Sequence, residues 1–255
     1  MAGFDRYDNI LKLFLEDQNA WTVPEIADAL GTAQSSIYRT VRELVASGFL
    51  EGTSESRYRL GPIFLEFDHR LRASDLLVRS GGLFLRTLVQ QAGLPCVAVL
   101  ARLYGDRVMC VADARSGPFD AETSYVRGRP MPIMRGATSK AILASMSGRK
   151  RTRLLSNFMD EDDPARERLN KELDGIRRAK VSVTRGEVDT GLVGLAVPVK
   201  NESQGINASL SFIVKNSDAT DAREPRLISL LTSHANLIES FLNDEDIAIS
   251  MSAAE

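Results

Sequence analysis

The chain has 255 residues, of which 44% are hydrophobic and 26% are charged, and its formal net charge at pH 7 is −2. A chain of this length and composition can bury a sizeable core as one large or two ordinary globular domains, and it has neither internal repeats nor low-complexity tracts. No apolar run approaches the roughly 20 residues that a membrane helix needs, and the first residues lack the basic flank and apolar core of a signal peptide, so we expect a cytoplasmic protein.

Three helices are predicted in the first 48 residues. The second helix begins after Thr22, which forms a capping box with Glu25 three residues later. It ends at Gly31, because glycine accepts the left-handed conformation that a tight turn requires. A third helix follows from about Gln34 and ends near Gly48. The expected inner-face residues are Ile10, Leu11, Phe14 and Leu15 in the first helix, Val23, Ile26, Ala27 and Leu30 in the second, and Ile37, Val41, Leu44 and Val45 in the third.

The spacing between the second and third helices is typical of a helix-turn-helix. Ala27 is small enough for the two helices to cross closely, Gly31 turns the chain, and Ile37 fills the space between the helices. A rotation of about 100° per residue places the polar residues of the third helix opposite its buried stripe. The residues of this helix that are expected to contact DNA are Ser35, Ser36, Tyr38, Arg39 and Arg42.

Residues 49–61 alternate in polarity and predict a β-hairpin, a wing whose Arg57 and Arg59 would contact the DNA backbone. The predicted winged helix-turn-helix domain, residues 1–61, carries more acidic than basic side chains, whereas DNA-binding domains are usually basic. We therefore expect weak nonspecific affinity and binding that depends on a dimer. In the alternative interpretation, Arg39 and Arg42 only solvate a surface helix.

Residues 62–78 are predicted to form a linker helix. Pro62 suits a first helical turn, and an apolar stripe follows it. The stripe contains Ile63, Phe64, Phe67, Leu71 and Leu77, of which Phe64, Phe67 and Leu71 are the expected dimer contacts.

A second domain of mixed helices and strands is predicted over residues 79–248. Strands are expected at 96–103, 108–112, 123–126, 181–184, 192–199 and 206–214, and helices near 80–92, 138–146, 164–179 and 223–242. The strands near 192 and 206 are expected to form an antiparallel hairpin through residues 200–205. This order predicts a two-domain α+β protein with an α/β sensor domain.

The cysteine and histidine residues do not suggest a metal site. Cys96 and Cys110 lie inside apolar runs, as buried reduced thiols do. His69 and His234 are far apart and have no cysteine or acidic pair nearby at ligand spacing. We expect no metal and no cofactor.

Several motifs resemble those of the isocitrate lyase regulator (IclR) family of bacterial transcription factors. The resemblance rests on residues 22–31 (TVPEIADALG), 36–44 (SIYRTVREL), 48–50 (GFL), 58–62 (YRLGP), 128–132 (GRPMP), 139–144 (SKAILA), 185–187 (RGE) and 191–199 (GLVGLAVPV). It implies that the third helix is a recognition helix and that the second domain is GAF-like, with a mostly antiparallel sheet. It also implies operator binding as a homodimer or a dimer of dimers.

A small-molecule site is predicted around residues 129–139. Apolar Met131, Ile133 and Met134 lead into a helix start, where backbone N–H groups favour an anion and Arg135 adds a positive charge. A carboxylate with an apolar body fits this pattern. Ordinary core packing is the alternative role for the two methionines. The resemblance adds, by position, the effector-contacting residues Ala137, Thr138, Thr184, Gly194 and Ser211.

The chain departs from the family pattern within this predicted site. Many members have His, Asp, Cys and a second Ser at the positions of Met134, Thr184, Gly194 and Ile213. The site is therefore expected to be roomier and more apolar than one that binds a two- or three-carbon acid. An aromatic or similarly bulky carboxylate, such as a hydroxybenzoate, is the expected effector.

A ligand-responsive transcriptional regulator is thus the predicted function, and there are two alternatives to it. An enzyme with an accessory DNA-binding domain would need a nucleophile with its base, metal ligands or a phosphate loop, and no such pattern occurs. Ser139 and Lys140 point about 100° apart on a helix, so they do not form a catalytic pair. A protein that uses the helix-turn-helix only for protein contacts would not bind duplex DNA.

The basic residues of 149–153 and the acidic run 160–163 are expected to be solvated and to pair with each other.

Overall fold

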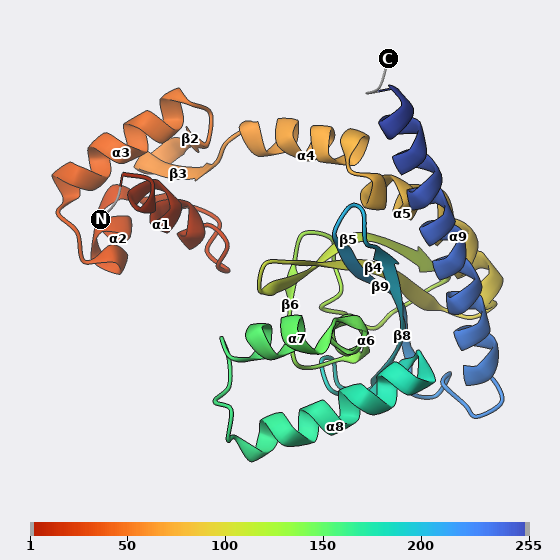
Figure 1. Cartoon of the computed structure of the whole chain (residues 1–255). Helices are drawn as coiled ribbons and strands as arrows, with labels where there is room; N and C mark the ends of the chain where they lie inside the picture. The colour runs from red at the N-terminus through yellow and green to blue at the C-terminus, as the bar shows by residue number, and fades with distance from the viewer. Residues whose placement is uncertain (1–2, 253–255) are drawn as a thin grey trace. The chain divides into compact units, whose positions relative to one another are not determined.

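A computed structural model describes the backbone of residues 3–252 and the side chains of residues 3–245. The chain forms two compact units, Met1–Ser74 and Asp75–Glu255 (Figure 1). Each unit has its own hydrophobic core, and the predicted two-domain α+β fold class is confirmed. Within the described residues, no helix combines the length and the apolar character needed to cross a membrane.

The first unit is a helical domain with a small antiparallel sheet in the order β1-β3-β2. Its elements are α1 (Asp5–Leu13), β1 (Trp21–Thr22), α2 (Val23–Leu30), α3 (Gln34–Ala46), β2 (Leu50–Gly52), the 3-10 turn η1 (Ser54–Ser56), β3 (Arg57–Leu60) and α4 (Ile63–Ser74). The predicted hairpin is formed by β2 and β3, which pair from Leu50↔Leu60 to Gly52↔Tyr58. This is the expected winged helix-turn-helix.

Local interactions form the two ends of α2 as predicted. The Thr22 hydroxyl accepts a hydrogen bond from the Glu25 N–H at 3.3 Å, and the Glu25 carboxylate accepts one from the Thr22 N–H at 2.7 Å. This reciprocal pair satisfies backbone donors that have no partner inside the helix. At the other end, Gly31 adopts φ 59° and ψ 36°, which is the left-handed conformation that starts the turn to α3.

Two inner-face predictions for the first unit are wrong. Leu15 is 72% exposed, because α1 ends at Leu13 and the periodicity no longer applies beyond it. Val45 is also exposed, and Thr40 instead completes the buried face of α3, with its hydroxyl donating to the Ser36 carbonyl at 3.1 Å. The buried core of this unit comprises Ile10, Phe14, Trp21, Ile26, Ala27, Ile37, Val41, Leu44 and Leu50.

The sequence predicts one linker helix over residues 62–78, whereas the structure contains a break within that range. α4 ends at Ser74, and α5 (Leu76–Ala92) begins the second unit. Asp75 between them has φ −78° and ψ 116°, and its carboxylate accepts a hydrogen bond from the Val78 N–H at 3.0 Å. Asp75 therefore caps a new helix, and Leu77 belongs to the core of the second unit.

The second unit is built on a six-stranded antiparallel sheet in the order β6-β5-β4-β9-β8-β7. Its strands are β4 (Cys96–Tyr104), β5 (Arg107–Ser116), β6 (Pro130–Met131), β7 (Ser182–Arg185), β8 (Leu192–Asn201) and β9 (Ile206–Lys215). Its helices after α5 are α6 (Ala137–Ser145), α7 (Gly148–Leu155), α8 (Pro164–Ala179) and α9 (Glu224–Ser252). The predicted hairpin of β8 and β9 is present.

The strand predicted at residues 123–126 does not form. Ser124 donates from both its N–H and its hydroxyl to the carboxylate of Asp189, at 3.0 and 2.7 Å. Side-chain bonds of this kind offer the backbone an alternative to a sheet ladder, so this segment is a loop although Tyr125 within it is buried.

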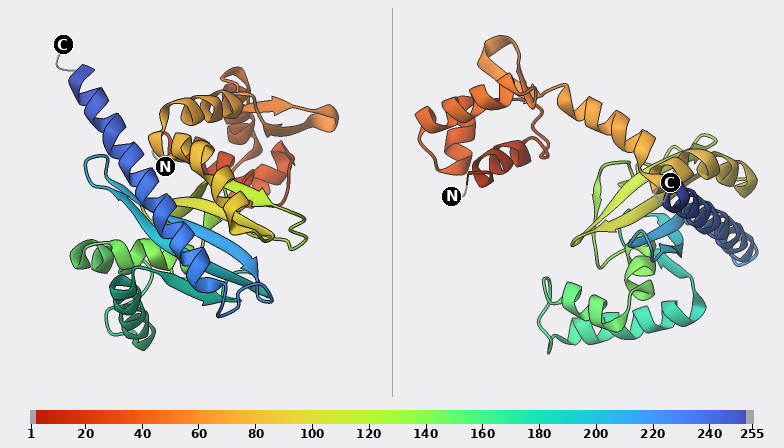
Figure 2. Two further views of the ribbon diagram at one scale, coloured as in Figure 1. Left: turned by 90° about the vertical axis from the view of Figure 1, so that its right-hand side faces the viewer. Right: turned by 45° about the horizontal axis from the view of Figure 1, so that its top comes forward.

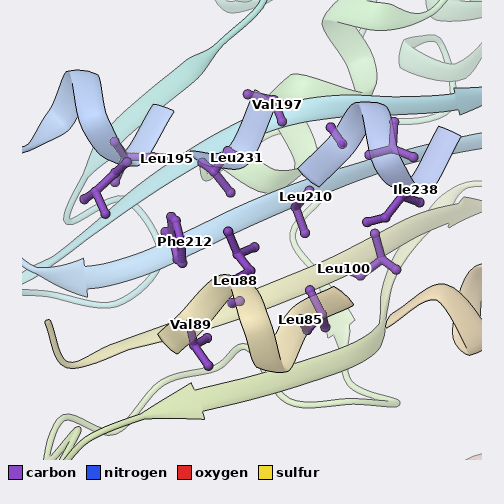
Figure 3. Close-up of a cluster of buried hydrophobic side chains, with 14 of the residues drawn as sticks. Leu85, Leu88, Val89, Leu100, Leu195, Val197, Leu210, Phe212, Leu231 and Ile238 are labelled. Atoms are coloured by element: carbon purple, nitrogen blue, oxygen red, sulfur yellow. The ribbon is translucent and has the colours of Figure 1, made fainter. Parts of the chain in front are cut away.

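Helices cover both faces of the sheet (Figure 1, Figure 2). α5 and α9 pack on one face, where the side chains of the two helices meet those of β4, β8 and β9 (Figure 3). This core includes Leu85, Leu88, Val89, Leu100, Leu195, Val197, Leu210, Phe212, Leu231 and Ile238. The other face carries α6, α7 and α8 over a second apolar cluster. The predicted effector residues on α6 and the strands lie on this second side.

β8 extends beyond its edge neighbour β7. The last β7 pair is Ser182↔Ala196, so residues 197–201 of β8 have no strand on that side among the described elements. Pro198 has no N–H to offer there, and the Lys200 N–H donates to the carboxylate of Glu239 in α9 at 2.8 Å.

Candidate functional sites

The polar face of α3 is accessible, as predicted from its periodicity. Ser35, Arg39 and Arg42 are exposed, Tyr38 is 54% exposed and Ser36 is half-buried. The opposite face of α3 packs into the core of the unit and so fixes which side of the helix points outward. Arg39 and Arg42 form no ion pair or hydrogen bond with any residue that the structure describes. Both guanidinium groups therefore remain available to bind phosphates or base edges.

The two wing arginines, by contrast, are held by carboxylates of their own unit. The Arg57 guanidinium pairs with Glu25 at 3.0 Å and donates to the Ala20 carbonyl at 2.8 Å, which ties the wing to the start of α2. Arg59 pairs with Glu51 on the neighbouring strand. The Thr22 N–H, assisted by the Arg57 charge, keeps the pKa of the Glu25 carboxyl below its ordinary value. Both arginines remain partly exposed, but neither is a free cation.

The predicted effector residues from α6, β7, β8 and β9 come together in the structure. The Thr184 hydroxyl accepts a hydrogen bond from the Ala137 N–H at 3.0 Å, and the Thr138 and Ser211 hydroxyl oxygens lie 3.0 Å apart. Gly194 is opposite Ala137, and a Cβ atom on it would lie 3.2 Å from the Ala137 Cβ. All of these residues are buried. A layer of hydroxyl groups, those of Thr138, Thr184 and Ser211, therefore lies where the start of α6 packs on the sheet.

The predicted effector residues in the segment before α6 differ in how deeply they are buried. Met131 is buried in the apolar cluster on this side of the sheet, and Met134 is half-buried against the same cluster. Arg135 is exposed, and its guanidinium donates to the backbone carbonyl of Glu187. The methionines thus form part of an apolar wall beside the hydroxyl layer, while Arg135 fastens the loop after β7.

Glu187, which the sequence prediction did not include, binds at the position expected for an anion. Its carboxylate accepts a hydrogen bond from the Gly136 N–H at 2.9 Å and pairs with the Lys140 ammonium at 2.7 Å. The Lys140 side chain is almost completely buried and also pairs with Glu172 at 2.7 Å. Glu187 lies within the RGE motif, but a separation of 51 residues from Gly136 gave no indication that the two would meet.

The pKa of Glu187 reflects this position. Burial alone would raise the pKa of its carboxyl, but the hydrogen bonds from Lys140 and from Gly136 together outweigh burial and leave the pKa below the ordinary value. The carboxylate is therefore ionised at neutral pH, and the start of α6 already holds one negative charge. A further acid at this point must compete with Glu187.

Tyr125 is the second important residue that the prediction missed as a site residue. A Cβ atom on Gly136 would lie 2.8 Å from the Tyr125 hydroxyl, so this hydroxyl lies directly beside the start of α6. Burial raises the pKa of Tyr125 to about 12, so its hydroxyl stays protonated at neutral pH and can donate a hydrogen bond. The surrounding loop is tied to the Glu187 loop because Asp189 accepts hydrogen bonds from both Thr123 and Ser124.

A cavity of about 590 Å³ lies near the opposite end of α6, between α6, α8, β8 and α9. Its main cations already bind the helix end: Arg177 Nε donates to the Ala144 carbonyl at 2.8 Å, and the Lys200 ammonium donates to the Ser145 carbonyl. These bonds satisfy carbonyl groups that a helix leaves without partners. The chemistry of this end is therefore helix capping, and it does not favour an anionic ligand.

Most residues of the two charged runs, 149–153 and 160–163, are exposed as expected, but Arg151 and Asp163 bind partners outside these runs. In α7, Arg151 pairs with Asp174 of α8 at 2.9 Å, and Asp163 caps α8 through the Ala165 N–H at 2.7 Å.

Burial raises the pKa of both cysteine thiols to about 12, so they stay protonated and unreactive.

Comparison with known proteins gives consistent matches to both units. The family model described as IclR helix-turn-helix domain matches residues 5–54, and the model described as bacterial transcriptional regulator IclR C-terminal matches residues 73–240. The HTH-type transcriptional regulator XynR of Escherichia coli K12 is 24% identical over 237 residues, which cover 87% of this chain and 89% of XynR.

Solved structures share the fold. An IclR transcriptional regulator from Alicyclobacillus acidocaldarius superimposes with a TM-score of 0.77 at 24% identity, over 94% of this chain and 98% of that one. An IclR homologue from Microbacterium hydrocarbonoxydans, solved in complex with 4-hydroxybenzoate, gives a TM-score of 0.78 at 23% identity, over 94% and 99% of the two chains.

Proposed function

Because this chain belongs to the IclR family of bacterial transcriptional regulators, we propose that it binds operator DNA as a dimer and that a small organic acid controls this binding. The motif resemblance is thus correct, and the alternative of an enzyme with an accessory DNA-binding domain is set aside, since the family consists of regulators. A protein that acts on operator DNA works in the bacterial cytoplasm, at the nucleoid, and we place this one there.

The observation that carries the DNA-binding proposal is the exposed face of α3, with Arg39 and Arg42 free of any described partner. Arginine donates two parallel hydrogen bonds to guanine or to phosphate, and one such contact contributes about 1–3 kcal/mol. In a two-fold dimer, substitution of one of these arginines removes the contact from both copies of α3. Ser35, Ser36 and Tyr38 flank the arginines and would complete the contact surface, while Arg57 and Arg59 would reach the backbone only from within their ion pairs.

An operator-binding experiment tests this proposal. Arg39→Ala should weaken binding to the operator at least tenfold, without changing the melting temperature of the protein. Arg86→Ala is the matched control, because Arg86 is an exposed arginine of α5 in the other unit. Equal operator affinity of wild type and Arg39→Ala in footprinting would remove Arg39 from the interface.

The dimer proposal is supported by the apolar stripe on α4. Phe64 packs edge-on against Phe49, with ring centroids 5.8 Å apart, but Phe67 and Leu71 on the same side of the helix remain 51% and 53% exposed. Exposed apolar side chains at helical spacing favour a second copy of the chain as their partner, and two dimers could pair further into a tetramer. Sedimentation analysis of wild type and of Leu71→Asp tests this, and a monomeric wild type at micromolar concentration would refute it.

The effector proposal combines the hydroxyl layer with the apolar wall. Thr138, Thr184 and Ser211 carry hydroxyl groups that can form hydrogen bonds, Ala137 and Gly194 beside them are small, and Met131 and Met134 suit a ring. An aromatic acid such as a hydroxybenzoate has this combination of groups, and a related regulator has been solved with 4-hydroxybenzoate. Calorimetry against aromatic acids and against pyruvate and glyoxylate tests the proposal. Tight binding of the short acids, with no aromatic acid bound, would overturn it.

A further inference from the structure

Ser139, in the first turn of α6, and Ser182, in β7, are buried serines whose hydroxyl groups have no hydrogen-bond partner among the described residues. Only 1% of Ser139 is exposed. Buried polar groups in folded proteins almost always have a partner, so each exception calls for a physical reason.

Several other helical hydroxyl groups in this chain are satisfied by carbonyls of the preceding turn. Thr40 donates to the Ser36 carbonyl, Ser80 to the Leu77 carbonyl at 2.7 Å, and Ser145 to the Ile142 carbonyl at 2.8 Å. Ser139 does not make this bond. The carbonyl three residues before it, that of Gly136, accepts the Lys140 N–H at 3.1 Å, and the Ser139 hydroxyl is not bonded to it.

The direction of the Ser139 side chain follows from helix geometry. At about 100° per residue, position 139 lies between positions 142 and 143 on the surface of α6. Ile142 and Leu143 are fully buried in the apolar cluster that also contains Met131 and Tyr125. The adjacent side chains point elsewhere, with Thr138 bonded to Ser211 and Lys140 to Glu187 and Glu172.

The wall that faces this part of α6 offers little to a hydroxyl group. The strand residues in the cluster include Val97, Val99 and Ala101 of β4, which are apolar. Cys110 of β5 directs its thiol to the Ala112 carbonyl at 3.5 Å. The Tyr125 hydroxyl in the same cluster interacts with Thr138, and the Ser139 hydroxyl has no partner among the described residues, so it is free to bond to a polar atom that enters the cluster.

We propose that the Ser139 hydroxyl determines effector specificity by hydrogen bonding to a polar ring substituent, so that the regulator prefers a hydroxylated aromatic acid to the unsubstituted acid. This inference rests on the proposed function, because it assigns a role within the same effector site. It goes beyond the effector-contacting residues that the family resemblance gives by position, since Ser139 is not one of them. Its chemistry requires one ring that carries a carboxylate and a separate hydrogen-bonding group.

The test compares affinities for benzoate and for 2-, 3- and 4-hydroxybenzoate, measured by calorimetry on the full-length protein. Wild type should bind at least one hydroxybenzoate ten or more times more tightly than benzoate. Ser139→Ala should reduce this preference to less than threefold by weakening the hydroxybenzoate while benzoate affinity is kept. Ser145→Ala is the control, because its hydroxyl is already bonded to its own helix, and it should keep the wild-type preference.

The possible failures separate the two proposals. If wild type binds benzoate and the hydroxybenzoates with equal affinity, or if Ser139→Ala keeps the tenfold preference, the role of Ser139 is refuted while the aromatic-acid effector stands. If wild type binds none of these acids, the proposed effector class fails and the inference fails with it. The wild-type affinity ratio alone can refute the inference, so the test does not depend on the variant folding.

Discussion

Replacing Glu187 with glutamine should tighten the binding of an acid effector about fivefold. In the structure, the Glu187 carboxylate accepts the Gly136 N–H and pairs with the Lys140 ammonium, so it holds the two groups best suited to an effector carboxylate. Glutamine has nearly the same shape but no charge. It therefore keeps the loop geometry while it weakens the internal competitor.

The size of the effect follows from hydrogen-bond energies. A hydrogen bond to a charged group contributes about 1.5–3 kcal/mol and a neutral one about 0.5–1.5 kcal/mol, so the competitor loses roughly 1 kcal/mol for each bond that becomes neutral. The Glu187 side chain is 31% exposed, and solvent screening reduces the contribution of its ion pair. Counting one bond gives about 1 kcal/mol, which corresponds to a factor of about five in affinity.

Calorimetric titration with 4-hydroxybenzoate measures the effect directly. Glu172→Gln is the matched control, because Glu172 also pairs with Lys140 and, within the described residues, does not bond to the Gly136 N–H. The control should change affinity less than twofold. Unchanged or weaker binding in Glu187→Gln would mean that the effector carboxylate does not displace Glu187, and the competition argument would have to be abandoned.

Three further outcomes are expected. The pKa of Glu187 is lowered in the folded chain, so the stabilisation by its carboxylate is complete above the unfolded-state pKa of about 4.3 and is lost as the pH falls through the folded-state pKa. The difference in melting temperature between wild type and Glu187→Gln should therefore shrink between pH 6 and pH 3.5. A difference that stays constant over this range would contradict the argument. Gly81→Ala should destabilise the protein by about 1–3 kcal/mol in urea unfolding, since its Cβ would lie 2.5 Å from a β5 side chain, whereas Gly82→Ala has open space and should stabilise α5 by up to about 1 kcal/mol. Gly61→Ala would place a Cβ 2.2 Å from a backbone oxygen and should abolish operator binding by displacing the wing, while Gly52→Ala, with no atom nearby, should bind normally.

Short-range patterns predicted the DNA-binding unit well. The capping box of Thr22 and Glu25 and the turn at Gly31 depend on residues three to nine positions apart, so the sequence contains all the information that forms them. The errors occur at element ends. Leu15 continues an apolar period that the helix itself does not continue, and Asp75 interrupts a stripe that looked continuous.

The effector site was predictable only in part. Ala137, Thr138, Thr184, Gly194 and Ser211 were identified by resemblance, and the structure brings them together. Glu187 and Tyr125 were missed because both reach the start of α6 from loops whose conformation depends on tertiary contacts. The loop at 123–126 has the β-branched and aromatic composition of a strand, and hydrogen bonds to Asp189 outweigh that propensity.

The end of β8 that extends beyond β7 affects whether a strand of another molecule can add to this edge of the sheet. Hydrogen-bonding direction alternates along a strand, so residues 198 and 200 face the same open side. Proline at the first position and Glu239 at the second leave an incoming strand few donors there to pair with. A stretch of strand edge blocked in this way resists the addition of another chain's strand at residues 197–201.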